Sequence, residues 1–573
     1  MYTAAVFFAC LTDAVWMHRV PLLCEQLQGP FHGKRLKLEI KNDFVFNFDS
    51  VAGMRNHSLS NRCGNTPNFS KALSMMLLAF NPAPMQLKVG KACSGKSMRR
   101  TSYPVATVPT AASYVLSRSL FLRWLGGVYL VANGVALRQN RPLLGTNGLL
   151  PVSKFLEFCR YRGESFWQRP TLMKLLIGKG GMKVPDVAVD RCLDALAVAG
   201  ILLAAPLVIT GSASAIQVFA LWALYTSLVN VGQRWYSFGW ESMLLETGFL
   251  ATFLCPLRPW AVSRVAFTPS PVCIWAFRWL LCRIMLGAGL IKLRSRDPCW
   301  RDLTAMDYHY QTQPIPNPLS RYLHQMPRAW HRFETFVGLW VVEIIAPLLL
   351  LLPGGGLTPI GALGVFFRRI SATIQIWFQF ILILSGNLSF LNWLTIAPAI
   401  MCLDDAALIR MIPWLAAPLP EVGSVATAGA WAGLGRFATL SAQSGLAALL
   451  IRCSVPVVRN MLSSKQRMNA AFGAWRFVNS YGAFGSVSKK RYEVMLEGTT
   501  ETVLPSTKWQ RFEFIAKPSN ANQVPRWLSP WHLRLDWLMW FLPFGNVQTQ
   551  PWLKPLVQKL LANDREVSRL LAR

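Results

Sequence analysis

Charged residues are scarce in this sequence. Asp, Glu, Lys and Arg together make up 15% of its 573 residues, whereas soluble globular proteins average about 25%. Hydrophobic residues account for 53%, and the mean hydropathy is +0.31. So few charges and so much apolar side chain exclude an ordinary soluble domain and are typical of a membrane protein.

Acidic residues are scarcer still, with 27 Asp and Glu against 59 Lys and Arg and a net charge of +32. An excess of this size is found in proteins that bind nucleic acid or anionic lipid, and in membrane proteins whose helices are flanked by basic loops. The sequence has no RNP-like pattern and no Gly-x-x-Gly clamp set in a soluble domain, which RNA-binding modules carry. We therefore expect the lipid bilayer, and no nucleic acid, as a partner.

The 12 cysteines include no C-x-x-C pair, and none lies beyond Cys453. This spacing excludes a thioredoxin-type redox centre and a zinc ribbon. Cys255, Cys282 and Cys402 lie in apolar segments, where a thiol behaves as a small hydrophobe. Nucleophile motifs and cofactor-binding loops are also missing, so we expect no metal, no cofactor and no catalytic residue.

Long stretches without charge are what the sequence has in abundance. No charged residue occurs between Ala195 and Gln233 or between Ile370 and Leu403, and one membrane crossing needs about 20 residues. The first stretch is long enough for two helices, with a hairpin at Gly211-Ser212. With the other apolar segments, the sequence predicts a multi-pass α-helical membrane bundle of about eight spans. The other segments are residues 120–137, 239–257, 272–292, 335–367 and 440–460.

The two ends of the chain differ from this bundle, which we place at residues 113–463. Residues 1–112 are basic and rich in Ser, Thr and Arg, which is typical of a transit peptide or an unstructured extension. In residues 464–573 apolar and polar side chains alternate, which predicts a smaller β-rich aqueous domain with a terminal helix. The expected strands are Arg491–Gly498, Trp509–Lys517 and Trp531–Trp537.

Among the charged residues that lie in predicted spans or near their ends, we single out five, because each such charge costs about 3 kcal/mol. Such groups face the interior of a bundle and pair there, so we interpret them as structural charges. We predict in particular that Glu246 pairs with Arg278 or Arg283. The alternative is a proton-transfer or carboxylation site. The five residues are Glu241, Glu246, Arg278, Arg283 and Lys292.

The segment MDYHYQTQPIPNP, Met306 to Pro318, joins two predicted spans. Its alternating prolines lack backbone donors and push the preceding residues out of the helical region, so we predict an extended loop. Asp307 and His309 would then project from one side, and with His324 and His331 could form a metal or acid–base site. Nothing else in the loop has the spacing of a known site, so we favour a structural loop.

Six long blocks stand out along the chain. They are LYTSLVNVGQRWYSFGWESMLLETGFLATFLCPL, RWLLCRIMLGAGLIKLRSRDPCWRDLTAMDYHYQTQPIPNPLSRYLHQMP, HRFETFVGLWVVEIIAPLLLLLP, LILSGNLSFLNWLT, VNSYGAFGSVSKKRYEVMLEGT and HLRLDWLMWF. In this order they resemble the lipase maturation factor family, and the resemblance runs from about Arg118 to the C-terminus. GAGLIK also resembles the transmembrane domain of vitamin K-dependent carboxylases. Residues 1–112 match no part of the family.

The resemblance implies a multi-pass protein of the endoplasmic reticulum membrane. It would assist the folding, assembly and maturation of secreted lipases by binding them, without being an enzyme. Its partners would be those lipases, together with endoplasmic reticulum oxidoreductases or chaperones. The alternative is a membrane-embedded enzyme, either carboxylase-like or redox-active. The basic extension leaves targeting to another organelle open.

Aromatic residues of the C-terminal domain are candidates for binding such a client, because this domain is the main aqueous surface that the sequence predicts. The competing interpretation is that they form the core of the domain, as aromatic side chains of strands commonly do. The candidates are Trp509, Phe512, Trp531 and Trp537.

Overall fold

The structure, a computed structural model, describes residues 35–41, 113–175, 186–257, 268–354, 358–415, 430–500, 508–520, 522–545 and 547–572. Apart from strand β1 (Arg35–Lys41), the basic extension expected at residues 1–112 lies outside the described residues.

The described chain is mainly helical, and five of its helices are long and apolar enough to cross a membrane. This agrees with a multi-pass bundle but does not confirm about eight spans. The uncharged runs at residues 195–233 and 370–403 each fall into one long and one short helix. The five long helices are α3 (Val115–Leu144), α5 (Asp186–Thr210), α8 (Pro271–Arg294), α14 (Pro359–Ser385) and α17 (Ala430–Leu462).

Shorter helices fill the bundle and connect the long ones. α7 (Gly239–Thr252) is buried along most of its length, and α12, η6 and α13 follow one another without a break. The other segments up to α17 are α4 (Val152–Tyr161), η3 (Leu172–Leu175), α6 (Ala215–Val231), η4 (Gln233–Tyr236), α9 (Pro298–Arg301), α10 (Ala305–Thr312), α11 (Ser320–His324), α12 (Arg328–Phe336), η6 (Val337–Ile345), α13 (Ala346–Leu349), α15 (Leu391–Ile400), α16 (Asp405–Met411) and η7 (Pro413–Leu415).

The hairpin between α5 and α6 turns at Gly211, the position predicted from the sequence. Its φ angle is +66°, and a Cβ at this position would lie 2.4 Å from Ser119 Oγ, so a larger residue would be strained there. Ser214 then caps α6 by accepting a hydrogen bond from Gln217 N at 3.2 Å. The turn and the cap together end one helix and begin the next.

The segment η6 is a π-helix, held in place by the polar face of α14. A π-helix shifts the backbone hydrogen bonds by one residue, which leaves carbonyl oxygens available to other donors. Ser371 Oγ donates to Ala346 O at 2.5 Å, and Gln375 Nε2 donates to Val342 O at 2.8 Å. These bonds explain why α14 buries polar side chains inside an apolar bundle.

A small antiparallel sheet replaces the β-rich domain expected at residues 464–573. Its strand order is β1-β2-β3, with β2 at Glu493–Thr499 and β3 at Gln510–Phe512. Leu496 of β2 lies opposite Leu38 of β1 and Phe512 of β3. The first two predicted strands therefore contribute to the sheet. The rest of the segment is irregular or helical, with α18 (Arg534–Met539), η8 (Leu542–Phe544), η9 (Val547–Thr549), α19 (Leu553–Leu561) and α20 (Arg565–Ser568).

The third predicted strand, Trp531–Trp537, is wrong, because its second half forms helix α18. The prediction took His532, Arg534 and Asp536 as the solvent face of a strand. In the structure all three are buried, as are the neighbouring apolar residues Leu535 and Trp537. Alternation of polar and apolar residues indicates a strand only where the polar face is exposed to water. In this segment the polar residues are buried as well, so the pattern does not indicate a strand.

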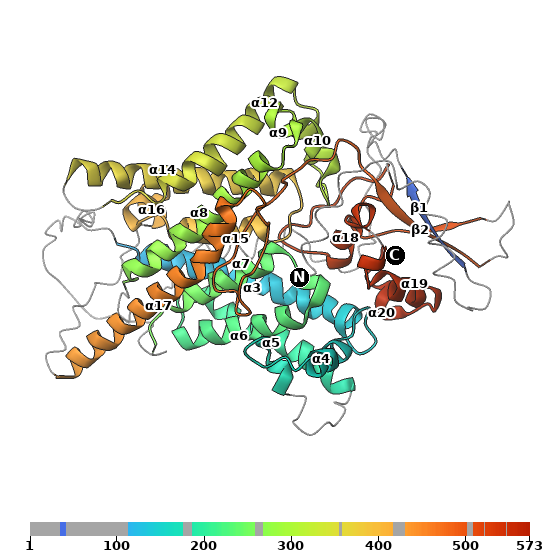
Figure 1. The fold of residues 1–573 in the computed structure, drawn as a ribbon, viewed down its shortest axis with the longest axis horizontal. Helices are drawn as coiled ribbons and strands as arrows, with labels where there is room; N and C mark the ends of the chain where they lie inside the picture. Colours follow the sequence, from blue (N-terminus) through green and yellow to red (C-terminus); the bar gives the residue numbers. More distant parts are fainter. Residues whose placement is uncertain are drawn as a thin grey trace, which may run out of the picture.

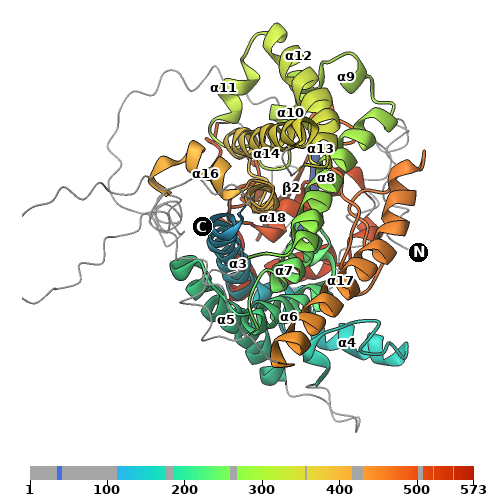
Figure 2. The same ribbon diagram turned by 90° about the vertical axis from the view of Figure 1, so that its left-hand side faces the viewer.

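The C-terminal segment, residues 466–572, packs against one end of the bundle. We call this the C-terminal end, and the opposite end, where α8 and α14 begin, the far end. In Figure 1 the strands, α18 and α19 lie on the right, whereas α14 and α17 begin on the left. Figure 2 looks onto the far end, with α14 and α15 seen nearly along their axes and α17 along one flank.

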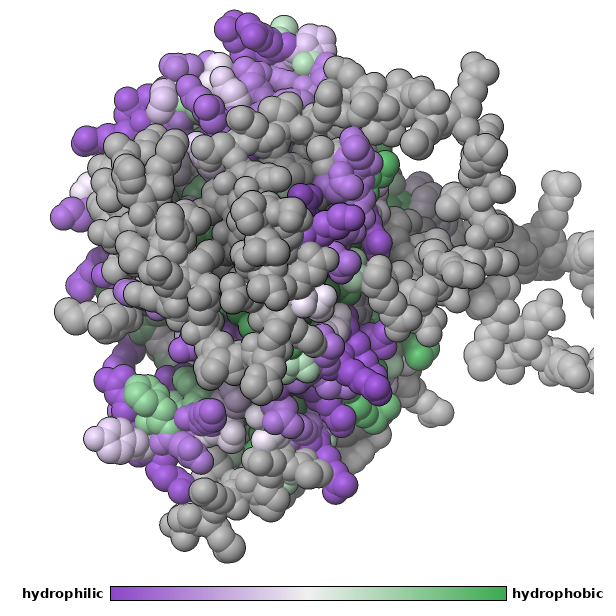
Figure 3. All heavy atoms as spheres, turned by 90° about the vertical axis from the view of Figure 1, so that its right-hand side faces the viewer, coloured by the Kyte–Doolittle hydropathy of each residue, from purple (hydrophilic) through white to green (hydrophobic). Residues whose placement is uncertain are grey.

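Hydrogen bonds from amide side chains of the bundle fix the C-terminal segment in place. Gln139 of α3 donates to His532 O at 2.7 Å and accepts from Arg534 N at 3.0 Å. Asn387, between α14 and α15, accepts from Leu528 N at 2.9 Å. Figure 3 shows the C-terminal end face-on, and hydrophilic residues predominate among those coloured there. This end therefore has the character of a surface in contact with water.

Because the five long apolar helices need a lipid environment, we expect the protein to stay in the membrane pellet after extraction with alkaline carbonate and to dissolve only in detergent. Fractionation followed by immunoblotting measures this. Recovery of the chain as a soluble monomer would contradict the architecture.

Candidate functional site

The C-terminal end of the bundle contains charged side chains that are buried among spanning helices. Glu241 and Glu246 both lie on α7 and are fully buried. A carboxylate in such a place needs a cation or several donors around it. The structure supplies these from the bundle and from the C-terminal segment together.

Glu246 accepts hydrogen bonds from four donor groups. Arg283 of α8 forms an ion pair with it, and Asn479 donates through its backbone N and its Nδ2, each at 3.0 Å. Tyr481 OH donates at 2.7 Å. Of the two partners considered from the sequence, the structure brings Arg283 to Glu246. Arg278 lies elsewhere and donates to Tyr114 OH.

Glu241 pairs with an arginine from the C-terminal segment, a contact that the sequence does not predict. Arg534 of α18 donates through Nη1 to Glu241 Oε1 at 2.8 Å, and its guanidinium lies 3.6 Å from the centre of the Tyr236 ring. Tyr225 OH donates to the same carboxylate at 2.5 Å. The signal that could have revealed Arg534 is the clustering of three polar residues among large apolar ones in HLRLDW, which is unusual for a water-facing strand.

Lys292, near the end of α8, forms an ion pair with Glu343 of the π-helix η6. Its ammonium also lies 4.7 Å from the centre of the Trp300 ring. Glu343 Oε2 has no hydrogen-bond partner among the described residues. The neighbouring His309 lies outside the spans, and burial together with the charge of Lys292 lowers its pKa to about 4. Among the described charged and titratable groups, Lys292, Glu343 and His309 come closest to the arrangement of a catalytic site.

The prediction of an extended loop at Met306–Pro318 is wrong in its first half, which forms α10. The prolines restrict only themselves and the residue before each of them, so the constraint begins at Gln313 and leaves the preceding residues free to form a helix. Asp307 and His309 consequently point to different neighbours. Asp307 Oδ1 lies 2.8 Å from His331 Nδ1, whereas the His309 ring packs edge-on against Phe484.

This separation removes the metal site considered from the sequence. In the described part of the chain, no group of three or more His, Cys, Asp or Glu side chains is arranged to hold a metal ion. The loop instead receives Arg491, which lies before β2. Its guanidinium donates to Gln311 O at 3.0 Å, Gln313 O at 2.5 Å and Pro314 O at 3.0 Å. The proline-rich segment thus anchors the sheet to the bundle.

The four aromatic candidates for client binding differ in exposure. Trp537 is 5% exposed and packs against the rings of Trp240 and His532, with centroids 5.1 and 5.8 Å away. It therefore belongs to the contact between α7 and the C-terminal segment and offers no surface. Trp509, Phe512 and Trp531 are each partly exposed.

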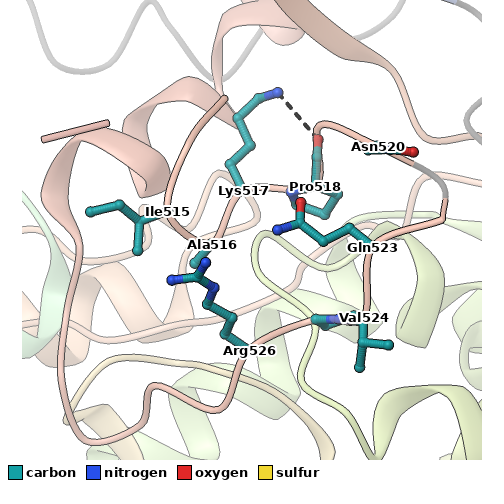
Figure 4. A pocket seen from close by; sticks show the side chains of 9 residues that line it. Ile515, Ala516, Lys517, Pro518, Asn520, Gln523, Val524 and Arg526 are labelled. Atoms are coloured by element: carbon teal, nitrogen blue, oxygen red, sulfur yellow. Dashed lines mark hydrogen bonds between the residues drawn. The ribbon is translucent and has the colours of Figure 1, made fainter. Parts of the chain in front are cut away.

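A small hollow lies elsewhere on the C-terminal segment, lined by residues between Ile515 and Arg526, as Figure 4 shows. Lys517 borders it, and Lys517 Nζ lies 3.4 Å from Pro518 O and 2.8 Å from Glu493 Oε2. Its volume of about 10 Å³ has room for no more than one water molecule, which needs about 10–15 Å³. It is too small to bind an organic ligand.

The described cysteines are all free thiols. Outside the spans, burial raises the pKa of Cys159 and of Cys299. A raised pKa keeps a thiol protonated and unreactive at neutral pH. The thiols therefore contribute packing and do not favour a redox-active site.

The contacts of Glu246 predict how its variants behave. Glu246→Ala leaves Arg283 buried without its ion pair, which costs about 3–5 kcal/mol, so we expect a lower steady-state level in membranes. Adding Arg283→Ala is expected to restore part of that level. Adding Arg278→Ala, the matched control, is not. Immunoblotting of membrane fractions gives the comparison, and equal effects of the two arginine substitutions would refute the assigned pairing.

The lowered pKa of His309 predicts a dependence of stability on pH. The unfolded chain protonates this histidine below about 6.5, whereas the folded protein keeps it neutral down to about 4. Its contribution is therefore complete above pH 6.5 and is lost at about 1.4 kcal/mol per unit as the pH falls. We expect the melting temperature in detergent to fall more between pH 7 and pH 5 for the wild type than for His309→Gln. Equal falls would show that His309 is not held neutral.

Two sequence models of known families match the chain. That of the lipase maturation factor transmembrane domain matches residues 116–410, and that of the lipase maturation factor C-terminal domain matches residues 477–573. The first match runs from the start of α3 into α16, and the second takes in β2, β3 and α18 to α20. Together they include both sides of the ion pair between Glu241 and Arg534.

Several curated proteins are similar to the chain over most of their length. It is 44% identical over 479 residues to lipase maturation factor 1 of Bos taurus, which covers 81% of each chain. It is 45% identical over 477 residues to lipase maturation factor 1 of Mus musculus, covering 80% of this chain and 79% of the relative. Lipase maturation factor 2 of Xenopus tropicalis is 29% identical over 80% of this chain and 75% of its own. No solved structure matches the chain.

Proposed function

The chain belongs to the lipase maturation factor family, and from this premise we propose that it helps secreted lipases to fold, assemble and become active. The observation that carries the proposal is the 44% identity to lipase maturation factor 1 over 81% of both chains. We further propose the endoplasmic reticulum membrane as its location, because secreted proteins fold in that compartment. Resident oxidoreductases or chaperones would be its partners there.

The mechanism that we propose is binding of the client and not chemistry on it. The charged groups at the C-terminal end are buried and engaged with one another, as with Glu241 and Arg534 or Glu246 and Arg283. Groups held in such pairs stabilise a fold but present no reactive atom to a partner. The raised pKa values of the described thiols outside the spans also favour binding over redox exchange.

The client surface would lie at the C-terminal end, where hydrophilic residues predominate among those coloured in Figure 3. Trp509 and Phe512 are partly exposed there, and Phe512 belongs to β3 at the edge of the small sheet. Partly exposed aromatic side chains on a sheet edge suit an extended client segment, which can pair with the strand and place its side chains against the rings.

The bundle itself would cross the membrane about eight times. Five helices meet the length and composition of a span, and three further segments would complete the number. α6 is apolar, α7 is shielded from lipid by its neighbours, and α12, η6 and α13 form one continuous helix. A helix buried in protein does not have to match the thickness of the bilayer as a lipid-facing one does.

A secretion assay tests the proposed surface. In cells that lack the endogenous factor, Trp509→Ala/Phe512→Ala is expected to lower secreted lipase activity per lipase molecule synthesised several-fold at normal membrane level. The matched control is Trp377→Ala, which removes a 63% exposed tryptophan within the span α14 and is expected to retain activity. Full activity of the double variant would place the client elsewhere.

A membrane enzyme is the second candidate, favoured by the unpaired Oε2 of Glu343 beside Lys292, whose charge also acts on His309. Glu343→Gln keeps the shape of this side chain and removes its charge. If client binding is the mechanism, this variant supports lipase secretion whenever its membrane level is normal. Loss of secretion at a normal level would favour catalysis.

A further inference from the structure

The far end of the bundle holds two buried arginines that form no ion pair with a described acidic residue. Arg278 of α8 is 5% exposed and Arg368 of α14 is 2% exposed. Arg278 donates through Nη2 to Tyr114 OH at 3.1 Å, but its Nε has no hydrogen-bond partner in the described structure. Arg368 has none for Nε or for Nη1. Both side chains are thus charged, buried and only partly satisfied.

The two guanidinium groups converge on one place. They lie close enough to act on each other electrostatically, and Tyr114, Asp404 and Cys402 also act on Arg368. Hydrogen bonds place both arginines near the start of α3: Arg278 contacts Tyr114, and Asp404, which pairs with the next residue after Arg368, is followed by the aspartate that accepts from Val115 N. The two arginines and these three neighbours come from four places in the chain: the residue before α3, α8, α14 and the segment between α15 and α16. Gly354 packs on Arg368, since a Cβ there would lie 2.7 Å from Nη1. Only glycine can approach this nitrogen so closely.

The nearest described carboxylates are engaged in other contacts. Asp404 forms a two-pronged ion pair with Arg369, with a closest distance of 2.6 Å, and accepts from Ala407 N at 2.9 Å. Asp405 accepts from Val115 N and Ser117 N, each at 2.9 Å, and so caps α3. Each carboxylate therefore balances a charge or a helix terminus of its own.

Two adjacent guanidinium groups at membrane depth repel each other and have lost their hydration, so an anion between them would lower their energy. A guanidinium offers paired N–H donors that match the oxygens of a phosphate group. Basic pockets between spanning helices near a membrane face bind the headgroups of anionic lipids in this way.

We propose that Arg278 and Arg368 form a binding site for a phosphate group, and that an anionic phospholipid supplies it. The site lies at the end of the bundle away from the C-terminal segment, so it is separate from the proposed client surface. Tyr114 OH is positioned to be a third donor, because it already contacts Arg278. The proposal does not depend on the identity of the client.

The test uses the purified full-length chain in mild detergent. Phosphatidylglycerol, phosphatidylcholine or inorganic phosphate is added, and native mass spectrometry counts the lipid retained while a melting curve measures stability. Phosphatidylglycerol is expected to be retained and to raise the melting temperature, since a ligand that binds only the folded state stabilises it. Phosphatidylcholine is expected to do neither. A rise in melting temperature with inorganic phosphate but not with phosphatidylglycerol would support the site and identify its ligand as a free anion.

The variant Arg278→Gln/Arg368→Gln is expected to retain phosphatidylglycerol at least about tenfold more weakly, the effect of losing a charge-assisted hydrogen bond. Arg410→Gln is the matched control, because Arg410 lies on α16 at the same end and is exposed. It is expected to retain the lipid as the wild type does. If the double variant does not fold, Arg278→Lys/Arg368→Lys takes its place in the test, because lysine keeps both charges but lacks the paired N–H donors.

Equal retention by the wild type and by either double variant would overturn the proposal, as would failure of the wild type to respond to both phosphatidylglycerol and inorganic phosphate. Loss of retention in Arg410→Gln to the same degree as in the double variant would also overturn it, because the effect would then be one of overall charge.

Discussion

A carboxylate inside a membrane bundle must be met by a partner, because an unpaired buried charge costs several kcal/mol. Glu241 and Glu246 on α7 impose this constraint on the whole protein. Among their partners, Arg283 belongs to the spanning helix α8 and Tyr225 to α6. Arg534, Asn479 and Tyr481 come from the C-terminal segment. That segment therefore contributes side chains to the bundle interior, although separate family models describe the two regions.

The parts of the fold that could be predicted from sequence are those with a local physical cause. The long apolar runs predict spanning helices because lipid offers backbone groups no partner, and Gly211 marks the turn between α5 and α6. The charge pairing could be narrowed only to two alternatives for Glu246, since a pair formed across distant segments has no local signature. Helices α10 and α18 were missed because proline spacing and alternation were given more weight than burial. Alternation alone places Arg534 on a water-facing side, whereas the structure buries it.

The helix α14 relates the two ends of the molecule. Near the far end it carries Arg368, which faces the proposed phosphate site. Further along, Ser371 and Gln375 hold the π-helix η6, which presents Glu343 to Lys292 of α8. One buried polar face thus positions the components of two separate charged clusters. This explains why a helix with a lipid-facing side of large apolar residues keeps a polar stripe on its other side, at a cost that its hydrogen bonds offset.

The ion pair between Glu241 and Arg534 joins residues that are 293 positions apart in the chain. At a synthesis rate of about 5–20 residues per second, α7 is made roughly 15–60 seconds before Arg534 leaves the ribosome. During that interval the growing chain holds a glutamate inside a half-assembled membrane core without its cation. The membrane part of this protein is therefore completed last by its own C-terminus. A ribosome that stops early would release a chain with an unfinished interior, which cellular quality control can recognise by its exposed charge.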